Sequence, residues 1–437
     1  MTPAARLSAA IEVIETIDAQ RIPAAQALKE WGTAHRFAGS GDRAGIAGLV
    51  WDVLRRRASS AWLMDDDGAR ARVLGMLKLE RGLDVDAIAA LCDGGRFAPA
   101  PLTQAERDAL ASRSLTDAPP PVAGDYPEWL DPSLAQAFGE DRVGEATAMA
   151  SRAPLDLRVN TLKAKREKVL ASLAHLGARP TPWSPVGLRI ELAADARNPG
   201  IQAEEDFIKG LVEVQDEGSQ LAALFSAAKP GEQVIDLCAG AGGKTLALAA
   251  MMQGKGRLIA TDRDKRQLAA IHERLSRAGA HNAEVRTPKG EADPLVGIAA
   301  SADLVLIDAP CSGTGTWRRN PDAKWRMRPG ALDIRVKDQI EVLDRATALV
   351  KPGGRIVYVT CSVLPVENGE QVRAFLARHG GFSIVPPAET ASVLWDKAEE
   401  FAAAALATPE GWLMTPRRTR TDGFFVSVLR RGLGPAP

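Results

Sequence analysis

Two cysteines stand where this chain is best placed to carry chemistry. Cys311 follows the apolar run DLVLIDA (303–309) and Cys361 follows RIVYVT (355–360), and a serine comes after each cysteine. Apolar runs that stop at a polar turn are typical of buried strands, and open α/β sheets collect reactive groups at the carboxyl ends of their strands. Two thiols in neighbouring loops suggest a covalent cycle in which each has a role. The alternative is that both are inert, buried side chains.

A glycine-rich turn provides a candidate cofactor site. VIDLCAGAGGKTLALA (234–249) predicts a strand, a turn and a helix whose first amides are free to bind a ligand. A Walker A loop requires glycine where Cys238 stands, and the dinucleotide motif requires glycine where Thr245 stands. Asp262, at the end of the next strand, is suited to bind ribose hydroxyls, or alternatively to cap a helix. A nucleoside without phosphates, such as S-adenosylmethionine, fits better than NAD or ATP.

Basic and aromatic side chains follow Cys311 directly. Two tryptophans, Trp317 and Trp325, alternate with the basic residues Arg318, Arg319, Lys324, Arg326 and Arg328. Such a mixture suits phosphate contact and base stacking, although Trp317 is equally well explained as a core residue. The arginines at 55–57 end an expected helix, where they either contact phosphates or interact with the helix dipole.

A methyl donor, a nucleophilic thiol and a nucleic-acid surface together point to methylation at carbon 5 of a pyrimidine. Carbon 5 becomes nucleophilic only after a thiolate adds to carbon 6. A base then removes the carbon 5 proton and the thiol leaves. The target base has to be unstacked to enter the pocket. Asp308, in the loop of Cys311, is placed to hydrogen-bond the ring nitrogen or the exocyclic amine.

The elements that must position these residues form an α/β domain. After residue 216, apolar strands alternate with helices, which predicts a doubly wound, mostly parallel sheet that closes with an antiparallel hairpin at GWLMTP and GFFVSVLRR. Upstream we expect an all-helical domain over 1–118, a proline-rich linker over 119–128 and a small α+β module over 129–215. The α/β domain then occupies 216–437.

Composition limits the class of protein. The 437 residues carry 55 basic and 55 acidic side chains, so the net charge gives no global hint of nucleic acid, although binding follows the local surface. No apolar run approaches the ~18 residues of a membrane span, and Glu12 and Glu15 interrupt any export signal. The four scattered cysteines predict no metal site or disulfide framework and fit the cytoplasm. We expect a monomer.

Several motifs together resemble the Nop/Sun family of RNA 5-methylcytosine methyltransferases, in particular its RsmB-like (Fmu/Sun) branch. They are DLCAGAGGKT (236–245), ATDRD (260–264), DAPCSGTGTWRRNPDAKW (308–325) and YVTCSVLPVENGEQV (358–372). The resemblance implies a class I methyltransferase sheet, S-adenosylmethionine as cofactor and a cytosine of RNA, in the small-subunit rRNA, as substrate. It further implies that the helical domain is a NusB-like RNA-binding domain and that the middle module recognises RNA.

The resemblance also assigns roles to residues. It implies that Cys361 attacks the base, that Cys311 assists release, and that Asp308 and Lys324 (in NPDAKW) lie near the reacting base. The cofactor is expected to contact Cys238, Ala239, Gly240, Ala241, Gly242, Gly243, Lys244, Asp262 and Asp308.

The chain departs from the family pattern at two places. Ala241 replaces a proline of the glycine loop, and Lys289 stands where an acid usually borders the adenine, so that Glu291 or Asp293 would have to substitute. These departures motivate an alternative function, a non-catalytic RNA-binding factor of ribosome assembly that retains the fold. Cytosine methylation of DNA is disfavoured, because the DNA enzymes attack from a PCxG-type loop and lack the TCS thiol.

Overall fold

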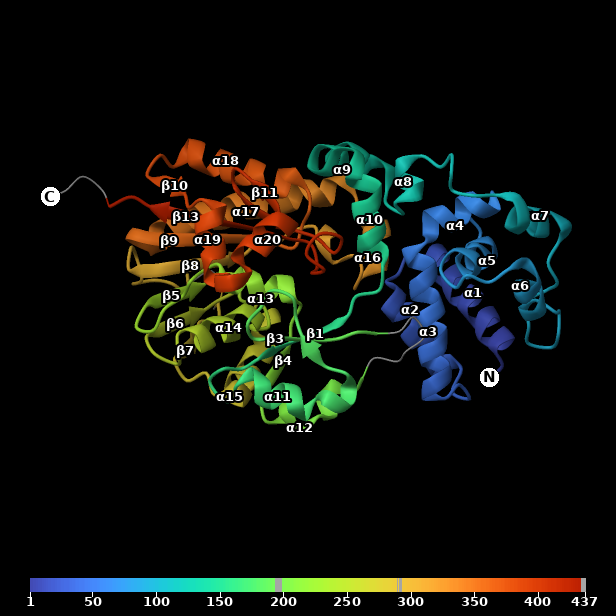
Figure 1. Cartoon of the computed structure of the whole chain (residues 1–437), viewed down its shortest axis with the longest axis horizontal. Helices are drawn as coiled ribbons and strands as arrows, with labels where there is room; N and C mark the ends of the chain where they lie inside the picture. Colours follow the sequence, from blue (N-terminus) through green and yellow to red (C-terminus); the bar gives the residue numbers. More distant parts are fainter. Residues whose placement is uncertain (193–198, 289, 291–292, 434–437) are drawn as a thin grey trace. The chain divides into compact units, whose positions relative to one another are not determined.

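The computed structural model describes residues 1–192, 199–288, 290 and 293–433 (Figure 1). Internal contacts divide this part of the chain into two compact units. The first unit contains Met1–Arg152 and, far along the sequence, Trp317–Met327. The second contains Ala153–Leu192 and residues 199–316 and 328–433. The chain therefore leaves the second unit after Thr316, contributes one segment to the first unit, and returns.

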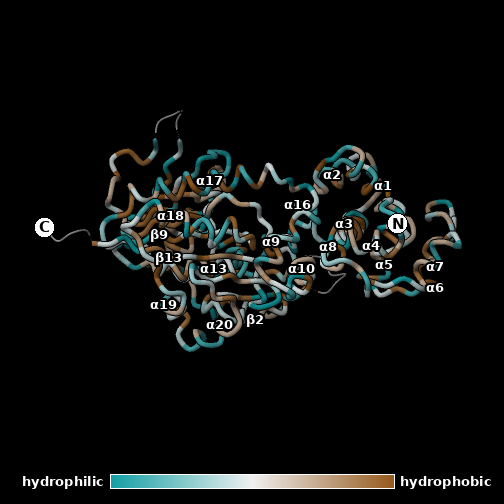
Figure 2. The backbone as a smooth tube through the Cα atoms, turned by 90° about the horizontal axis from the view of Figure 1, so that it is seen from above, coloured by the Kyte–Doolittle hydropathy of each residue, from teal (hydrophilic) through white to brown (hydrophobic). Residues whose placement is uncertain are grey.

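The first unit is all-helical, as its periodic apolar residues predict. Helix-capping residues define several of its ends: Thr2 caps α1, Asp84 caps α6, and Thr103 forms a capping box with Glu106 at α7. Hydrophobic and hydrophilic residues alternate along these helices, and the apolar ones form one core (Figure 2). The helices are α1 Pro3–Gln20, α2 Ala24–Ala34, α3 Ser40–Arg55, α4 Arg57–Met64, α5 Ala69–Leu79, α6 Val85–Leu91, α7 Gln104–Ser112, α8 Pro120–Ala123, α9 Asp131–Phe138, α10 Arg142–Ala150 and α16 Pro321–Arg326.

The segment 119–128, expected to be a linker, is packed into this unit. It contains α8, and it buries Asp125 and Tyr126. The carboxylate of Asp125 accepts hydrogen bonds from the backbone and side chain of Ser59, and the Tyr126 hydroxyl donates to Asp131 at 2.6 Å. Proline here starts a short helix because its fixed φ suits the first helical turn. The residues of the expected module over 129–215 are divided between the two units, since α9 and α10 belong to the first unit and the residues from Ala153 onward belong to the second.

A small α+β fold begins the second unit. Among the described residues, four antiparallel strands form a sheet in the order β2-β3-β1-β4. Buried Asp156 and Arg189 face each other across this sheet in a bidentate pair at 2.7 Å. The elements are β1 Leu155–Val159, α11 Arg166–Ser172, β2 Arg179–Pro180, β3 Gly187–Ile190, α12 Glu205–Ile208 and β4 Val212–Val214.

The rest of the second unit is the predicted α/β domain. Nine strands of the described chain form one sheet, ordered β11-β12-β13-β9-β8-β5-β6-β7 with β10 beside β13. The pairs from β7 to β9 are parallel, whereas β12–β13 and β13–β9 are antiparallel, which includes the expected hairpin. The strands are β5 Gln233–Asp236, β6 Arg257–Ala260, β7 Ala283–Val285, β8 Ala302–Asp308, β9 Val350–Thr360, β10 Phe382–Ile384, β11 Leu406–Thr408, β12 Gly411–Met414 and β13 Phe424–Arg431.

Helices connect these strands and cover the sheet (Figure 1). They are α13 Glu217–Leu224, α14 Gly243–Met251, α15 Ile271–Ala278, α17 Pro329–Leu349, α18 Gly369–Arg378, α19 Pro387–Ala391 and α20 Ala398–Ala404. The strand order reverses between β5 and β8, because β6 and β7 lie on one side of β5 and the later strands on the other. In open α/β sheets, ligands bind outside the carboxyl ends of the strands at such a reversal. The described helices include none long and apolar enough to cross a membrane.

Candidate active site

The glycine loop lies at this reversal, between the end of β5 and the start of α14. Gly240 and Gly242 have φ of 51° and 85°, a conformation that favours glycine. A Cβ on Gly242 would lie 2.5 Å from Cγ1 of Ile271, so this position also requires the absence of a side chain. Both glycines are thus required by the turn at the end of the strand, where the sequence predicts a ligand cradle.

Asp262 holds the loop from the next strand. Its Oδ2 accepts a hydrogen bond from the Gly240 amide at 2.9 Å, and its Oδ1 accepts one from Asp264 at 2.8 Å. The described helix that follows, α15, begins at Ile271, so Asp262 does not cap it. The carboxylate stays partly exposed, which leaves it able to accept hydrogen bonds from ribose hydroxyls as well.

Lys244 is not available to bind a phosphate. Its ammonium is buried and pairs with Oδ2 of Asp308 at 2.6 Å, and it also lies 5.1 Å from the ring centroid of Phe424. A P-loop lysine has to be free to reach phosphate oxygens. The glycine loop therefore fits a nucleoside without phosphates, and Lys244 instead fixes the carboxylate that precedes the PCSG motif.

Asp236 is a buried acid that is not among the residues expected to contact the cofactor. One carboxyl oxygen accepts the Thr245 hydroxyl at 2.6 Å, whereas Oδ1 has no hydrogen-bond partner among the described residues. Burial, with a smaller contribution from the nearby Asp308, raises the pKa of Asp236 to about 7. Its position as an acid ending a buried strand was the signal in the sequence.

The two cysteines meet. Parallel pairing of β8 with β9 brings the ends of both strands together, and the Sγ atoms of Cys311 and Cys361 lie 3.3 Å apart. Both are free thiols and both are half-buried. The hydrogen bond to Cys361, together with burial, raises the pKa of the Cys311 thiol well above its usual value. The raised pKa favours the protonated form of Cys311.

A buried glutamate, Glu367, ties the two cysteine loops together. Its carboxylate accepts the Ser312 amide at 2.7 Å, the Ser312 hydroxyl at 2.5 Å and the Gln339 side-chain amide at 3.0 Å. A backbone hydrogen bond from Gly315 to the Cys361 carbonyl, at 2.9 Å, joins the loops a second time. Sequence reasoning missed Glu367, although an acid inside the apolar run VLPVEN is a signal that it has a buried partner.

The other two cysteines lack the features of a nucleophile. Burial and three neighbouring carboxylates raise the pKa of Cys238 well above its usual value. Burial also raises the pKa of Cys92, which lies in the core of the first unit. Both thiols therefore stay protonated, and a protonated thiol is a poor nucleophile.

Lys324 belongs to the first unit and not to the unit of the two cysteines. Its ammonium is buried, donates to the Arg55 carbonyl at 3.2 Å and lies 5.0 Å from the ring centroid of Trp325. Burial lowers the pKa of Lys324 to about 7, against the effect of nearby Asp125. Trp317 is buried in the same unit, in agreement with the core interpretation.

Of the three residues considered for the position that borders the adenine, the structure describes one, Asp293. Lys289 and Glu291 lie outside the described residues. Asp293 accepts a hydrogen bond from the Leu295 amide at 2.9 Å and pairs with Arg345, so its part in binding stays a prediction. No cluster of histidine, cysteine or acidic side chains suited to hold a metal ion occurs in the described ranges.

Solved structures share this fold. A crystal structure of the protein PH0851 aligns with a TM-score of 0.71 at 25% identity, over 99% of both chains. A methyltransferase homolog from Pyrococcus horikoshii aligns with a TM-score of 0.57 at 26% identity, over 73% of this chain and 99% of that one. NSun6 from the same organism, crystallised with SFG, shows the fold alone, at 20% identity and a TM-score of 0.58.

Sequence comparisons point the same way. The Ribosomal RNA small subunit methyltransferase B of Pectobacterium atrosepticum is 36% identical over 260 residues, which are 60% of this chain and 59% of that protein. The chain thus matches about three fifths of the length of these relatives. Residues 126–197 match a ferredoxin-like domain described as Methyltr_RsmF/B-like, and residues 223–430 match the family described as 16S rRNA methyltransferase RsmB/F. Over these residues the chain is similar to the RsmB/F family of 16S rRNA methyltransferases.

Proposed function

We propose that this protein transfers a methyl group from S-adenosylmethionine to carbon 5 of a cytosine in small-subunit ribosomal RNA, through a covalent adduct between Cys361 and the base. The observation that carries the proposal is the pair of thiols 3.3 Å apart beside the glycine loop. The names of the relatives support an rRNA substrate. A protein that only binds RNA does not need two adjacent free thiols at the ends of neighbouring strands. Their presence disfavours the alternative function, a non-catalytic factor of ribosome assembly.

Cys361 acts first. Its thiolate adds to carbon 6 of the cytosine, and the electron pair displaced from the ring double bond makes carbon 5 nucleophilic. Bound S-adenosylmethionine supplies the electrophilic methyl group. Asp308, held by Lys244 at 2.6 Å, is positioned to hydrogen-bond the exocyclic amine while the adduct exists.

Cys311 acts in the release step. When the carbon 5 proton leaves, its electron pair restores the ring double bond, and the pair of the carbon 6–sulfur bond returns to Cys361 as thiolate. In the free protein the pKa of Cys311 is held high by its hydrogen bond to Cys361 and by burial. Once the Cys361 sulfur is bonded to the base, the hydrogen bond between the two thiols that raises the pKa of Cys311 is lost. Cys311 can then give up its own proton to solvent and, as a thiolate, accept the carbon 5 proton.

The test replaces each thiol in turn. Cys361→Ala should abolish transfer of labelled methyl groups to small-subunit rRNA, and transfer at the wild-type rate would refute the mechanism. Cys311→Ala should retain attack but release slowly, so a protein–RNA band should persist on denaturing gels. Cys238→Ala is the matched control and should form no such band, because the raised pKa of this thiol excludes it from attack. Bisulfite sequencing of the RNA identifies the modified cytosine.

A further inference from the structure

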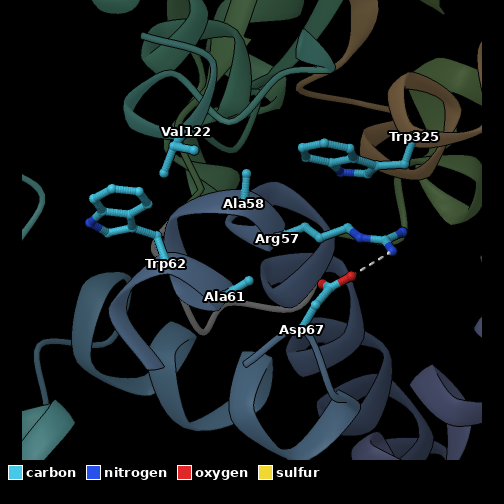
Figure 3. Close-up of a pocket in the computed structure, with 7 residues that line it drawn as sticks. All are labelled: Arg57, Ala58, Ala61, Trp62, Asp67, Val122 and Trp325. Atoms are coloured by element: carbon cyan, nitrogen blue, oxygen red, sulfur yellow. Dashed lines mark ion pairs between the residues drawn. The ribbon is translucent and has the colours of Figure 1, made fainter. Parts of the chain in front are cut away.

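A cavity of about 490 Å³ opens on the first unit, and all of the residues that line it belong to that unit. Figure 3 shows two indoles at this cavity, Trp62 from α4 and Trp325 from α16, with the side chain of Arg57 extending between them toward Trp325. Its lining also includes Asp67 and three small or apolar side chains, Ala58, Ala61 and Val122. The volume accommodates a nucleotide, and the walls are the aromatic surfaces on which unpaired bases stack.

Trp62 is left with an exposed ring. It is 40% exposed, whereas most tryptophans of folded proteins bury their rings. Its indole nitrogen donates to the Ser114 carbonyl at 3.3 Å, which fixes the ring orientation without covering its face. Trp325 is anchored in the same way, because its indole nitrogen donates to the Leu54 carbonyl at 2.7 Å. Both rings are thus held in place before any ligand arrives.

A loosely paired arginine and aspartate supply the polar contacts. Arg57 meets Asp67 at 3.5 Å and Asp18 at 3.9 Å, both longer than a normal hydrogen bond, and its guanidinium lies 5.7 Å from the ring centroid of Trp325. Asp67 is 65% exposed. A donor beside an acceptor matches the edge of a nucleobase. Guanine matches best, because its Watson–Crick edge offers O6 to the arginine and two N–H donors, on N1 and the 2-amino group, to the carboxylate.

The acidic residues next to the cavity do not repel RNA as a cluster. Asp65 pairs with Arg113 at 2.9 Å, Asp66 accepts the Gly68 amide at 2.8 Å, and Asp67 also lies 3.5 Å from Arg72. Arginines therefore compensate the charges of Asp65 and Asp67, and the carboxylate of Asp66 accepts a hydrogen bond from a backbone amide.

From this geometry we infer that the cavity between Trp62 and Trp325 binds an unstacked guanine nucleotide of single-stranded RNA. The base stacks on the indoles, Asp67 accepts from N1 and the 2-amino group, and Arg57 donates to O6. The inference rests on the proposed RNA substrate and adds to it a site that selects a second nucleotide, distinct from the cytosine that is methylated.

The experiment measures binding of three fluorescently labelled 11-mers to the full chain by anisotropy. They are an oligouridine and the same strand with either guanosine or inosine at its centre; inosine lacks the 2-amino group. Wild type should bind the guanosine strand roughly tenfold more tightly than the inosine strand, the value of one hydrogen bond to a charged acceptor. Asp67→Ala, which removes the accepting carboxylate, should bind both alike, and Trp62→Ala should lose roughly tenfold for both.

Phe97→Ala is the matched control, because Phe97 is an exposed aromatic residue of the same unit (65% exposed) that does not line the cavity. It should bind as wild type does. Equal binding of guanosine and inosine by wild type, or a guanosine preference that survives Asp67→Ala, would overturn the inference. Methyl transfer to rRNA is assayed separately: if it fails while the guanosine preference holds, the proposed function fails and the binding site stands.

Discussion

Replacing Glu367 with alanine should disconnect the two cysteine loops. The Glu367 carboxylate is buried and accepts three hydrogen bonds, two from Ser312 and one from Gln339. Ser312 adjoins Cys311, and Glu367 follows Cys361 by six residues, so one side chain sets the position of both thiols. Without it, the loop of Cys311 loses its buried carboxylate contact with the loop of Cys361, and only neutral hydrogen bonds and the contact between the two thiols continue to join the loops.

The size of the effect follows from the donors left behind. The Ser312 N–H would lose its acceptor, at about 1–3 kcal/mol, whereas the Gln339 side-chain amide would keep only its hydrogen bond to the Pro310 carbonyl at 3.0 Å. The free energy of unfolding should therefore fall by at least about 1–3 kcal/mol. A displacement of the thiols by ~1 Å would reduce kcat roughly 100-fold. Glu367→Gln keeps the oxygen that accepts both N–H groups, and it should therefore restore part of the loss.

Thermal unfolding and single-turnover methyl transfer, measured on the same preparations, test this expectation. Glu341→Ala is the control, because Glu341 is 74% exposed and its carboxylate lies 3.8 Å from the exposed Arg263. It should change neither quantity. Wild-type kcat in Glu367→Ala would refute the argument that Glu367 positions the thiols, and equal losses in the Ala and Gln variants would refute the role of its accepting oxygen.

Two further predictions concern the glycine loop. Burial raises the pKa of Asp236 to about 7, so the native protein holds a proton that the unfolded chain releases near pH 4, and this stabilisation, up to roughly 4 kcal/mol, is lost as pH rises through 7. Asp236→Asn should remove that slope, so its unfolding temperature relative to wild type should rise from pH 5 to pH 8; parallel curves would contradict the assignment. Gly242→Ala places a Cβ 2.5 Å from Ile271 at a φ of 85° and should weaken S-adenosylmethionine binding, measured by calorimetry, roughly tenfold. Gly231→Ala, with a φ of 89° but open space at its Cβ, is its control and should leave binding unchanged.

The sheet and the meeting of the cysteines were predictable because both follow from local patterns. Buried parallel strands are nearly continuous apolar runs, and once two such strands are neighbours their ends must meet. This is why Cys311 and Cys361 could be paired in advance, and the same holds for the loop before α14. The family of the chain was recognisable from the same motifs.

What the sequence did not reveal depends on contacts between distant residues. Arg55 donates to the Arg318 carbonyl across 263 positions, and Asp322 accepts the Ala24 amide across 298. No periodicity within a short window reports such pairs, so the packing of Lys324 in the helical unit could not be predicted, and its place near the reacting base, which the family resemblance implies, stays a prediction. Glu367 was overlooked for the same reason: its partners lie 55 and 28 residues away.

The return of the chain into the helical unit has a consequence for its synthesis. Helix α16 packs on α3, and Trp325 and Lys324 bond to the last carbonyls of that helix, yet they leave the ribosome long after residue 152. At translation rates of roughly 5–20 residues per second, the first ten helices wait on the order of 10–35 seconds for their last partner. A fragment that ends at residue 152 would expose the surface that α16 covers, so truncation cannot isolate the native helical unit, and a nascent chain should need protection at that surface until residue 327 has emerged.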